Sequence, residues 1–210
     1  MGIVERKQRE RNLRKTQILD AAKKIFLAKG FSGTTIEEIA RAEEISSGTI
    51  YLYFKNKDDL YASLNLKTLD SLNRRLGKTI ANTQLTIEEK LDRAWKSLYK
   101  VFRSDPIALR VVFHFQLEDS LQLLSPPMLS SLNKVSKSII NRIALIFQGG
   151  IDEGRFLERN AMSMADVFMS LFIGLVLWED AKRRLDPRKD YLEPTLKLGF
   201  EFVKRAIDKS

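Results

Sequence analysis

The stretch SSGTIYLYFKNK, residues 46–57, begins with small polar residues and continues with aromatic residues and lysines. Its aromatic and basic side chains follow in this order: Tyr51, Tyr53, Phe54, Lys55 and Lys57. Acidic residues stand on both sides of the stretch, but none lies within it. This ordering, in an otherwise acidic neighbourhood, indicates a surface that approaches a polyanion closely.

A short helix is predicted just upstream of the stretch and ends near Glu43. A threonine followed three residues later by a glutamate forms a capping box, and the sequence offers two such pairs, Thr34 with Glu37 or Thr35 with Glu38. Isoleucine and alanine then recur at spacings of three and four, as in an amphipathic helix. The segment therefore starts a helix at one of the two threonines.

A second short helix is predicted over residues 47–53, with Ser46 as its N-cap. The residues expected to hold the two helices together are Ile39, Ala40, Ile45, Ile50 and Tyr53. Two short helices joined by a tight turn, the second with a small and polar outward face, are the sequence pattern of a helix-turn-helix. A helix over residues 10–29, ending at Gly30, completes a three-helix unit.

The residue types of the second helix are those that bind DNA phosphates. Hydroxyls and helix N-terminal amides at Ser46, Ser47 and Thr49 can donate to phosphate oxygens. Gly48 removes a side chain where a groove would come closest, and Tyr51 projects as an amphipathic contact. The two lysines that end the stretch can follow the DNA backbone, which acids would repel.

The run GFSGTTIEEIARAEEISSGTIYLYFKNKDDLY, residues 30–61, resembles the N-terminal domain of the TetR family of transcriptional regulators. That family's pattern reads Gly-aromatic, Thr-Thr/Ile, Ile-Ala, a turn, then Ser-x-Gly-Thr-h-Tyr-x-Tyr-Phe-x-x-Lys-x-x-Leu, and nearly every position matches over about 45 residues. One departure is Glu44, where the family usually has glycine. A modest strain is expected there, with the side chain pointing to solvent.

The resemblance implies which residues touch DNA. It implies phosphate contacts by Thr34, Thr35 and Lys57, and recognition-helix contacts by Ser47, Gly48, Thr49, Tyr51 and Tyr53. Ser46 and Lys55 join this DNA-binding set on the residue types alone. Phe54 is expected to pack between this unit and the helix that follows.

The charge balance also favours a polyanionic partner. The formal net charge is +9 and the pI is near 9.7. Residues 1–15 form a basic arm with six Lys or Arg against two Glu. With 210 residues and 44% hydrophobic content, the chain can bury a core in one or two domains.

Several functional classes have little support. The sequence has no cysteine and one histidine, His114, so thiolate sites, cysteine nucleophiles and paired-histidine zinc sites are excluded. No phosphate-binding glycine loop follows a strand pattern. We therefore predict no enzyme activity, no metal and no cofactor.

The chain is expected to be cytoplasmic and to bind no membrane. Its start, MGIVERKQRE, has no apolar signal core. The longest apolar run, residues 161–178, contains Asp166 and two serines and barely reaches spanning length. A buried helix is the preferred interpretation of this run.

The rest of the chain is predicted to be helical as well. Apolar spacing of three and four predicts helices over residues 57–82, 87–103, 107–124, 129–153, 162–185 and 191–207. Pro126 and Pro127 are expected to break the chain. The fold class is therefore all-α with about nine helices. An N-terminal helix-turn-helix domain, residues 1–55, is joined through a long helix to an effector-binding and dimerisation domain, residues 56–210.

An aromatic-rich group in the larger domain suggests an effector pocket for an apolar or amphipathic molecule. Its candidate residues are Trp95, Leu98, Tyr99, Phe102, Val111, His114 and Phe115. Ordinary core packing is the alternative for most of them. For His114 the alternative is an ion pair with Glu118, one helical turn away.

The last two helices carry more apolar residues than one bundle face needs. The candidate dimer-interface residues are Phe168, Leu171, Phe172, Leu175, Trp178, Leu196, Phe200 and Val203. Burial within one monomer is possible, but the resemblance implies a four-helix interface between two copies. A two-fold dimer places two recognition helices about 34–36 Å apart and predicts a near-palindromic operator.

The resemblance thus implies a ligand-responsive regulator, most often a repressor. It would bind double-stranded operator DNA as a homodimer and be released by a small-molecule effector that favours a tilt of the shared long helix. The alternative is a basic helical dimer that acts at a membrane surface or as a structural interaction protein. That alternative leaves residues 46–57 unexplained.

Overall fold

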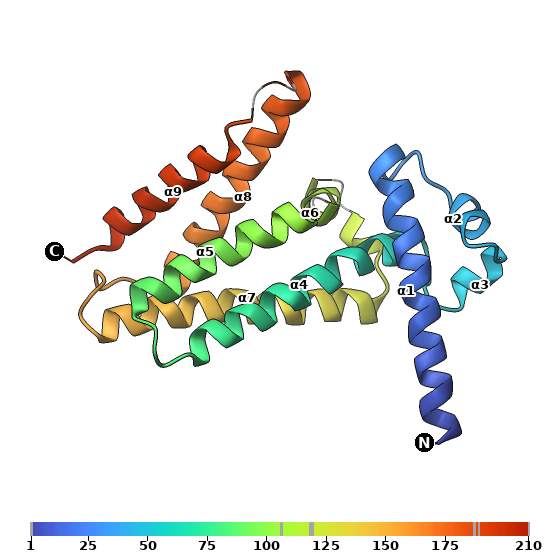
Figure 1. Cartoon of the computed structure of the whole chain (residues 1–210), viewed down its shortest axis with the longest axis horizontal. Helices are drawn as coiled ribbons and strands as arrows, with labels where there is room; N and C mark the ends of the chain where they lie inside the picture. Colours follow the sequence, from blue (N-terminus) through green and yellow to red (C-terminus); the bar gives the residue numbers. More distant parts are fainter. Residues whose placement is uncertain (1, 106, 118–119, 187, 189, 210) are drawn as a thin grey trace. The chain divides into compact units, whose positions relative to one another are not determined.

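The computed structural model describes residues 2–105, 107–117, 120–186, 188 and 190–209. Within these residues the chain forms nine α-helices and one short 3₁₀ helix, with a single isolated bridge between Phe156 and Asp208 (Figure 1). The prediction of an all-α fold is confirmed.

The contacts divide the chain into two compact units. Unit 1 comprises Met1–Leu69 and Ser104–Lys134, and unit 2 comprises Asp70–Arg103 and Val135–Ser210. Two helices, α4 and α7, continue from one unit into the other. The segment predicted as the helix-turn-helix domain lies inside unit 1, which also takes in residues far along the chain.

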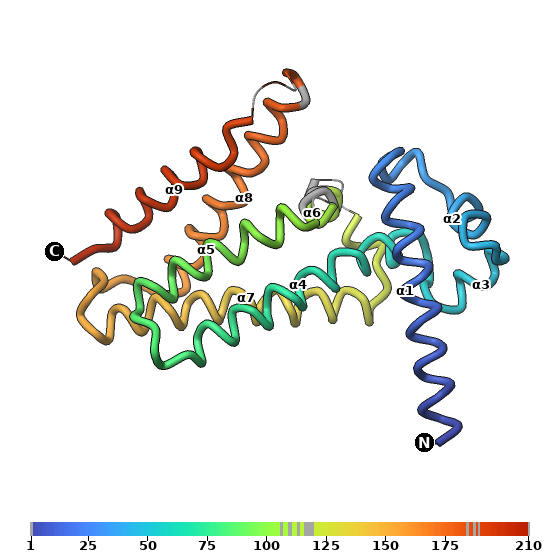
Figure 2. The backbone as a smooth tube through the Cα atoms, viewed as in Figure 1, coloured from blue at the N-terminus to red at the C-terminus, as the bar shows by residue number. Residues whose placement is uncertain are grey.

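Unit 1 begins with α1 (Ile3–Lys29), followed by α2 (Ile36–Ala42) and α3 (Ser47–Tyr51) (Figure 2). Helix α1 ends at Gly30, whose φ of 74° is one that glycine adopts readily and whose N–H donates to the carbonyl of Phe26. The helix starts seven residues before the predicted position. The basic arm is therefore part of α1.

Helix α2 starts at the second of the two possible capping boxes. The Thr35 hydroxyl accepts the Glu38 N–H at 3.2 Å, and the Glu38 carboxylate accepts the Thr35 N–H at 3.1 Å. The turn after α2 holds Glu44 at a φ of 53°, with its side chain exposed. The expected strain and orientation of Glu44 are both found.

Helix α3 is short but well defined at its start. Ser46 is its N-cap, as predicted, and the Ser46 hydroxyl accepts the Thr49 N–H at 3.1 Å. Ile50 is fully buried, and its carbonyl accepts the N–H groups of Tyr53 and Phe54. These bonds carry the chain around the end of α3 and bring Phe54 into the core, as predicted.

The core of unit 1 joins the helix-turn-helix to elements that are distant in sequence. These are the start of α4 (Lys57–Ala81), α6 (Ile107–Leu117), the 3₁₀ helix η1 (Ser120–Leu123) and the first turns of α7 (Pro126–Asp152). Buried side chains of this shared core include Ile18, Phe26, Ile39, Ile50, Leu60, Ile107, Val111 and Phe115. Residues 1–55 thus share their core with later segments of the chain, and the domain boundary after residue 55 stays a prediction.

Two helix boundaries differ from the prediction. The helix expected over residues 107–124 is divided into α6 and η1. Pro126 and Pro127 open α7 instead of only breaking the chain, because the first turn of a helix needs no N–H donor for an intrahelical bond. Helix α7 therefore starts three residues earlier than predicted.

Unit 2 is built around α5 (Ile87–Ser104), α8 (Ala161–Leu185) and α9 (Leu192–Ile207). Helices α8 and α9 lie side by side (Figure 1). Trp95 of α5 is the centre of the core, with Phe168, Phe172 and Phe200 at ring-centroid distances of 5.0, 5.2 and 5.3 Å. All three helices therefore contribute to this aromatic core.

Candidate nucleic-acid interface

The outward face of α3 carries small and aromatic side chains. Ser46 and Gly48 are exposed, Ser47 and Thr49 are half-buried, and Tyr51 is 52% exposed. The hydroxyls of Ser46 and Thr49 lie 2.9 Å apart. The structure thus brings these five predicted residues together on one short surface.

The fold itself leaves room for a side chain at Gly48. A Cβ built there would meet only the Ser46 hydroxyl oxygen, at an ordinary contact distance of 3.6 Å. The backbone of Gly48 is helical and needs no special conformation. The fold therefore does not require glycine at this position, and close approach of DNA to Gly48 stays a prediction.

The two threonines before α2 lie in different surroundings. Thr34 is fully buried, and its hydroxyl donates to the carbonyl of Gly30 at 2.7 Å. The Thr34 side chain does not reach the surface, and a phosphate contact by this residue stays a prediction. Thr35 is exposed and stays in the predicted set.

Lys57 faces the segment that leads into α2. Its ammonium donates to the carbonyls of Phe31 and Thr34 at 3.1 and 3.0 Å and lies 4.2 Å from the centroid of the Phe31 ring. Lys57 therefore holds the start of α2 in place. A direct bond from Lys57 to phosphate stays a prediction.

Two basic residues of α1 lie next to the end of α3. The guanidinium of Arg11 is 5.9 Å from the Tyr53 ring centroid, and the ammonium of Lys15 is 5.4 Å from the Phe54 ring centroid. Neither α1 residue was among the predicted DNA contacts. The charge of the basic arm indicated a role for this segment, but only the contacts to α3 show where it lies.

An ion pair supports the start of α2. The Lys29 ammonium lies 2.5 Å from the Glu38 carboxylate, and this hydrogen bond lowers the pKa of Glu38 below its usual value. The carboxylate is ionised at neutral pH, so it can accept the Thr35 N–H. The capping box at the start of α2 is therefore complete at neutral pH.

The residues predicted to form the effector pocket belong to two separate cores. Val111, His114 and Phe115 are buried in unit 1, and Trp95 and Leu98 are buried in unit 2. Tyr99 and Phe102 are half-buried in unit 2. Those of the set that are fully buried pack in cores, which was the alternative interpretation.

His114 lies in an aromatic environment close to the helix-turn-helix. Its ring centroid is 4.0 Å from that of Phe31 and 5.4 Å from that of Tyr61, and its Nε2 is 3.7 Å from an oxygen of Asp58. Glu118, the partner proposed from the sequence, lies outside the described residues. His114 therefore contributes to the packing of unit 1.

An open depression of about 450 Å³ lies elsewhere in unit 2. It is lined by Arg103, Asp190, Leu192, Glu193, Pro194 and Lys197. None of these residues belongs to the predicted pocket. Its lining is more charged than an apolar effector would require.

The predicted dimer-interface residues differ in burial: most are buried inside unit 2, and Trp178 is exposed. Phe168, Phe172, Leu196, Phe200 and Val203 are buried inside unit 2, so they are not available to a second copy as the structure stands. Leu171 and Leu175 are half-buried, and Trp178 is 65% exposed. Phe168, Phe172 and Phe200 pack on Trp95, and the interface between two copies stays a prediction.

Another set of apolar side chains is exposed on α8 and α9. It comprises Val167, Trp178, Leu198 and Phe202, all at least half exposed, with Gly174 between the two α8 residues. We call this set the outer stripe. Among the described residues, Ala161–Arg183 is also the one helix segment with the length and hydropathy to cross a membrane.

Sequence comparison places the start of the chain in a known group. A family model described as "Bacterial regulatory proteins, tetR family" matches residues 18–64. The HTH-type transcriptional regulator YhgD of Bacillus subtilis is 24% identical over 174 residues, which cover 82% of this chain and 88% of that protein. The fatty acid metabolism regulator protein of the same species is 29% identical over 143 residues, covering 68% and 70%.

Solved structures show the same fold over most of the chain. FadR of Bacillus subtilis in complex with stearoyl-CoA matches with a TM-score of 0.70 at 23% identity, covering 91% of this chain and 98% of that one. PfmR of Thermus thermophilus matches with a TM-score of 0.70 at 19% identity, covering 91% and 99%. The likeness thus extends from the helix-turn-helix into the larger helical region.

Proposed function

We propose that the chain is a transcriptional regulator of the TetR family, and that it is a repressor that binds a near-palindromic operator as a dimer. Like its relatives, the chain is a regulator and not an enzyme. The observation that carries the proposal is the face of α3. It is free of acids and well capped, and it contains a glycine that the fold does not require.

The face of α3 matches what the major groove of DNA admits. Its N-terminal amides and hydroxyls, at Ser46, Ser47 and Thr49, suit phosphate oxygens at the groove edge. Tyr51 supplies an exposed ring and hydroxyl for a base edge or sugar. Such contacts position the helix well, but they are less diagnostic of base sequence than arginine bound to guanine.

The outer stripe supports the dimer. Exposed apolar residues on two adjacent helices are best covered by the same two helices of a second copy, because a two-fold interface is self-complementary. Gly174 lies within this stripe. Apart from the adjacent backbone of α8, no atom of the described residues lies within 4 Å of a Cβ built there. That opening would let a partner helix approach closely.

We further propose an amphipathic effector with a long acyl chain, such as an acyl-CoA. The support is the similarity to a fatty acid metabolism regulator over 70% of its length and the shared fold with a protein solved in complex with stearoyl-CoA. Unit 2 is rich in aliphatic and aromatic side chains, so it could hold an acyl chain after side-chain movement.

The conformational change that releases the protein from DNA would be transmitted through helices that both units share. Helix α4 carries Lys57 beside α2 and buries Leu72 and Leu76 in unit 2. An effector that binds better when α4 is displaced would also change the position of α3. A coupling free energy of about 1–3 kcal/mol is sufficient for a response of about 5- to 150-fold.

Effector control is tested by DNA binding in the presence of an acyl-CoA. The protein would first be used to select a bound duplex from a random pool. Purified protein would then be titrated into the fluorescently labelled duplex, with and without stearoyl-CoA. We expect stearoyl-CoA to lower the affinity at least about fivefold. An unchanged affinity with each acyl-CoA that binds the protein would contradict the proposed effector control.

The alternative, a membrane-surface protein, is tested beside it. Its support is the length and hydropathy of Ala161–Arg183 together with the positive net charge. We expect salt-sensitive binding to duplex DNA at protein concentrations where phosphatidylserine vesicles bind little. Binding to the vesicles without affinity for DNA would favour the alternative.

The proposed function also implies a cellular location. A regulator of this family needs access to DNA, so the location that follows from the proposal is the cytoplasm of a bacterium.

A further inference from the structure

Helix α1 is longer than its packing requires. Its first buried residue is Ile18, and residues 2–17 are exposed except for Lys15, which is half-buried. Figure 1 shows this half of α1 continuing past α2 and α3 toward the N-terminus. At about 1.5 Å per residue, its fifteen helical residues before Ile18 span about 22 Å.

The basic residues of this half are concentrated on one face. Lys7, Arg11 and Arg14 follow one another at steps of four and three, and Ile18 is four residues further. Residues at these spacings share a face of an α-helix. The face that enters the core at Ile18 therefore continues outward as a basic face, and Lys15 lies beside it.

The two acids of the segment lie off this face. At about 100° per residue, Glu5 and Glu10 fall more than about 60° from the line through Lys7, Arg11 and Ile18. Glu10 instead pairs with Arg6, at 3.4 Å, on the side of the helix. Glu10 is three residues from Lys7 and four from Arg14, so its carboxylate borders the basic face, which still carries more positive than negative charge.

The contacts with α3 show where the basic face points. Arg11 lies over Tyr53, and Lys15 lies over Phe54, directly after the recognition helix. Both pairs lie within unit 1. The basic face therefore begins beside the end of α3 and continues away from it along α1.

We propose that this basic face is a second DNA-binding surface, which contacts the phosphate backbone beside the half-site that α3 reads. The proposal rests on the proposed function, since it needs α3 to lie in a groove. Duplex DNA carries one negative charge per about 1.7 Å of its axis, so a helix of about 22 Å can lie along several phosphates. Exposed lysine and arginine chains contact phosphates without reading bases.

An anionic membrane fits this surface less well. A basic helix that binds membranes needs an apolar face beside its charges. The exposed apolar residues here are Ile3, Val4 and Leu13, and Leu13 falls on the opposite side of the helix from Val4. DNA is therefore the partner that the charge pattern favours.

Two triple variants with the same net charge test the proposal. Lys7→Gln, Arg11→Gln and Arg14→Gln remove the basic face. Arg6→Gln, Arg9→Gln and Lys24→Gln remove equal charge from the other side of α1. All six side chains are exposed, so both variants should fold like the wild type, which circular dichroism checks.

The measurement is the affinity for the selected operator and for a random duplex at several salt concentrations. Each phosphate contact contributes about 0.9 to the slope of log K against log salt. We expect the basic-face triple to reduce the slope of the dimer by at least about two and to weaken both duplexes by about tenfold or more. The control triple should change the slope by less than about one.

A hydroxyl-radical footprint supplies a second readout. We expect the wild type to protect backbone positions just outside each half-site, and the basic-face triple to lose that protection while keeping the half-sites. Equal losses in the two triples, or an unchanged footprint, would overturn the proposal. Loss of phosphatidylserine vesicle binding with an unchanged DNA slope would overturn it in favour of a membrane surface.

The failure of this proposal and the failure of the proposed function give different results. If the wild type recovers no specific duplex, the proposed function fails and the second surface fails with it. If the wild type binds an operator and the two triples behave alike, the basic face alone is excluded.

Discussion

At the scale of single residues, fold and function place different demands on neighbouring positions. Glu44 occupies a turn at a φ of 53°, which glycine would adopt with less strain. Gly48 occupies a helical position where alanine would fit. The chain thus lacks glycine where its backbone favours one and has glycine where the backbone does not need it. This contrast is the reason to assign Gly48 to DNA binding.

Gly48→Ala should separate stability from DNA binding. Alanine is favoured over glycine in a helix by about 1 kcal/mol, so the free energy of unfolding should rise by up to that amount. The added methyl group would stand at the closest approach to DNA, and we expect operator affinity to fall about tenfold. Urea unfolding and fluorescence anisotropy measure the two effects. An unchanged operator affinity would contradict the role of Gly48.

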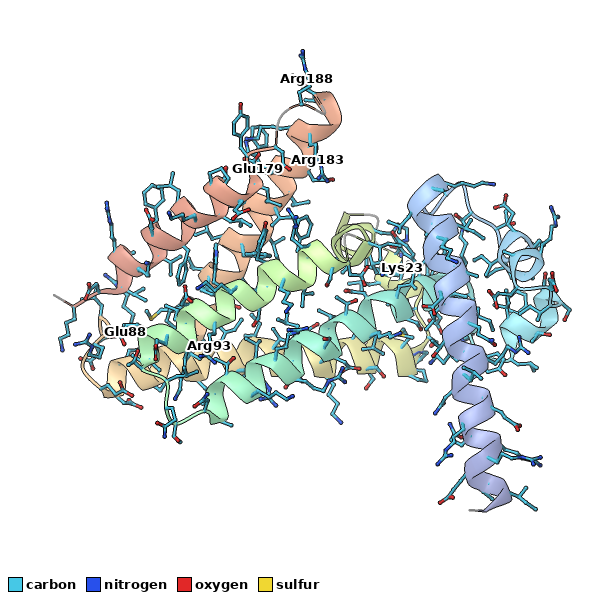
Figure 3. The ribbon with its side chains drawn as sticks, in the orientation of Figure 1. Lys23, Glu88, Arg93, Glu179, Arg183 and Arg188 are labelled. Carbon is cyan, nitrogen blue, oxygen red and sulfur yellow. The ribbon has the colours of Figure 1, made fainter. Side chains whose placement is uncertain are left out.

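An ion pair at the start of α5 gives a pH prediction. Glu88, labelled in Figure 3, accepts a hydrogen bond from Arg155 at 2.7 Å, and this bond lowers the pKa of Glu88 below 4.5. Its stabilisation is therefore present above pH 4.5 and is lost as the pH falls through the lowered pKa.

Glu88→Gln should lower the melting temperature at pH 7 by only about a degree or two, because the pair is largely exposed. Thermal melts of wild type and variant should converge as the pH falls through the lowered pKa of Glu88. A difference that is the same at pH 7 and at about pH 3 would contradict this assignment.

At the scale of helices, the sequence predicted what local chemistry decides. The caps at Thr35 and Ser46 and the end of α1 at Gly30 depend on residues a few positions apart. Ser46 and Gly30 were predicted, and Thr35 was one of two predicted caps. The start of α1 was missed because its first turns have no apolar period to reveal them. Exposed basic residues form a helix there as a continuation of the packed part.

The faces of α8 and α9 could not be predicted in the same way. Helix α8 is apolar nearly all round, so its sequence does not distinguish core from surface. Trp95, from a helix much earlier in the chain, selects Phe168 and Phe172 for the core and leaves Trp178 outside. Contacts between helices that are distant in sequence likewise divide the predicted pocket residues between the cores of unit 1 and unit 2.

Trp178→Glu should weaken the dimer. An exposed tryptophan that becomes buried in an apolar interface is among the residue types that contribute most to binding, so we expect the dimer dissociation constant to rise at least about tenfold. Leu145→Glu is the matched control, since Leu145 is 58% exposed on α7, away from the outer stripe. Sedimentation velocity measures both. Equal behaviour of the two variants would contradict the outer-stripe dimer.

At the scale of the whole molecule, hydrogen bonds and ion pairs within unit 1 join the predicted helix-turn-helix segment and the start of α4 to later segments of the chain. The Asp105 carboxylate, two residues before α6, accepts the Thr68 hydroxyl at 2.5 Å and pairs with Lys23 of α1 at 2.8 Å. The Asp59 carboxylate accepts the N–H of Ser125 at 2.9 Å. The segments around Asp105 and Ser125 are thus bonded to α1 and to the first half of α4. Lys23 is labelled in Figure 3.

Asp105→Asn should weaken the communication between effector and DNA. The amide keeps the shape of the carboxylate but loses the charge that holds Lys23, so α6 and α1 can move apart more easily. We expect the effect of stearoyl-CoA on operator affinity to fall several-fold, while the affinity for stearoyl-CoA changes little. Asp92→Asn is the control, because Asp92 pairs with Lys96 at the surface of α5. An unchanged effector response in Asp105→Asn would contradict this route.

We propose above all that the face of α3 reads a two-fold symmetric operator. The most direct test is the selection of bound duplexes from a random pool with purified protein at two salt concentrations. We predict enrichment of a near-palindromic motif whose half-sites are centred about 34–36 Å apart, with recovery falling steeply as salt rises. Recovery of no motif, with only salt-sensitive binding to any duplex, would contradict the claim.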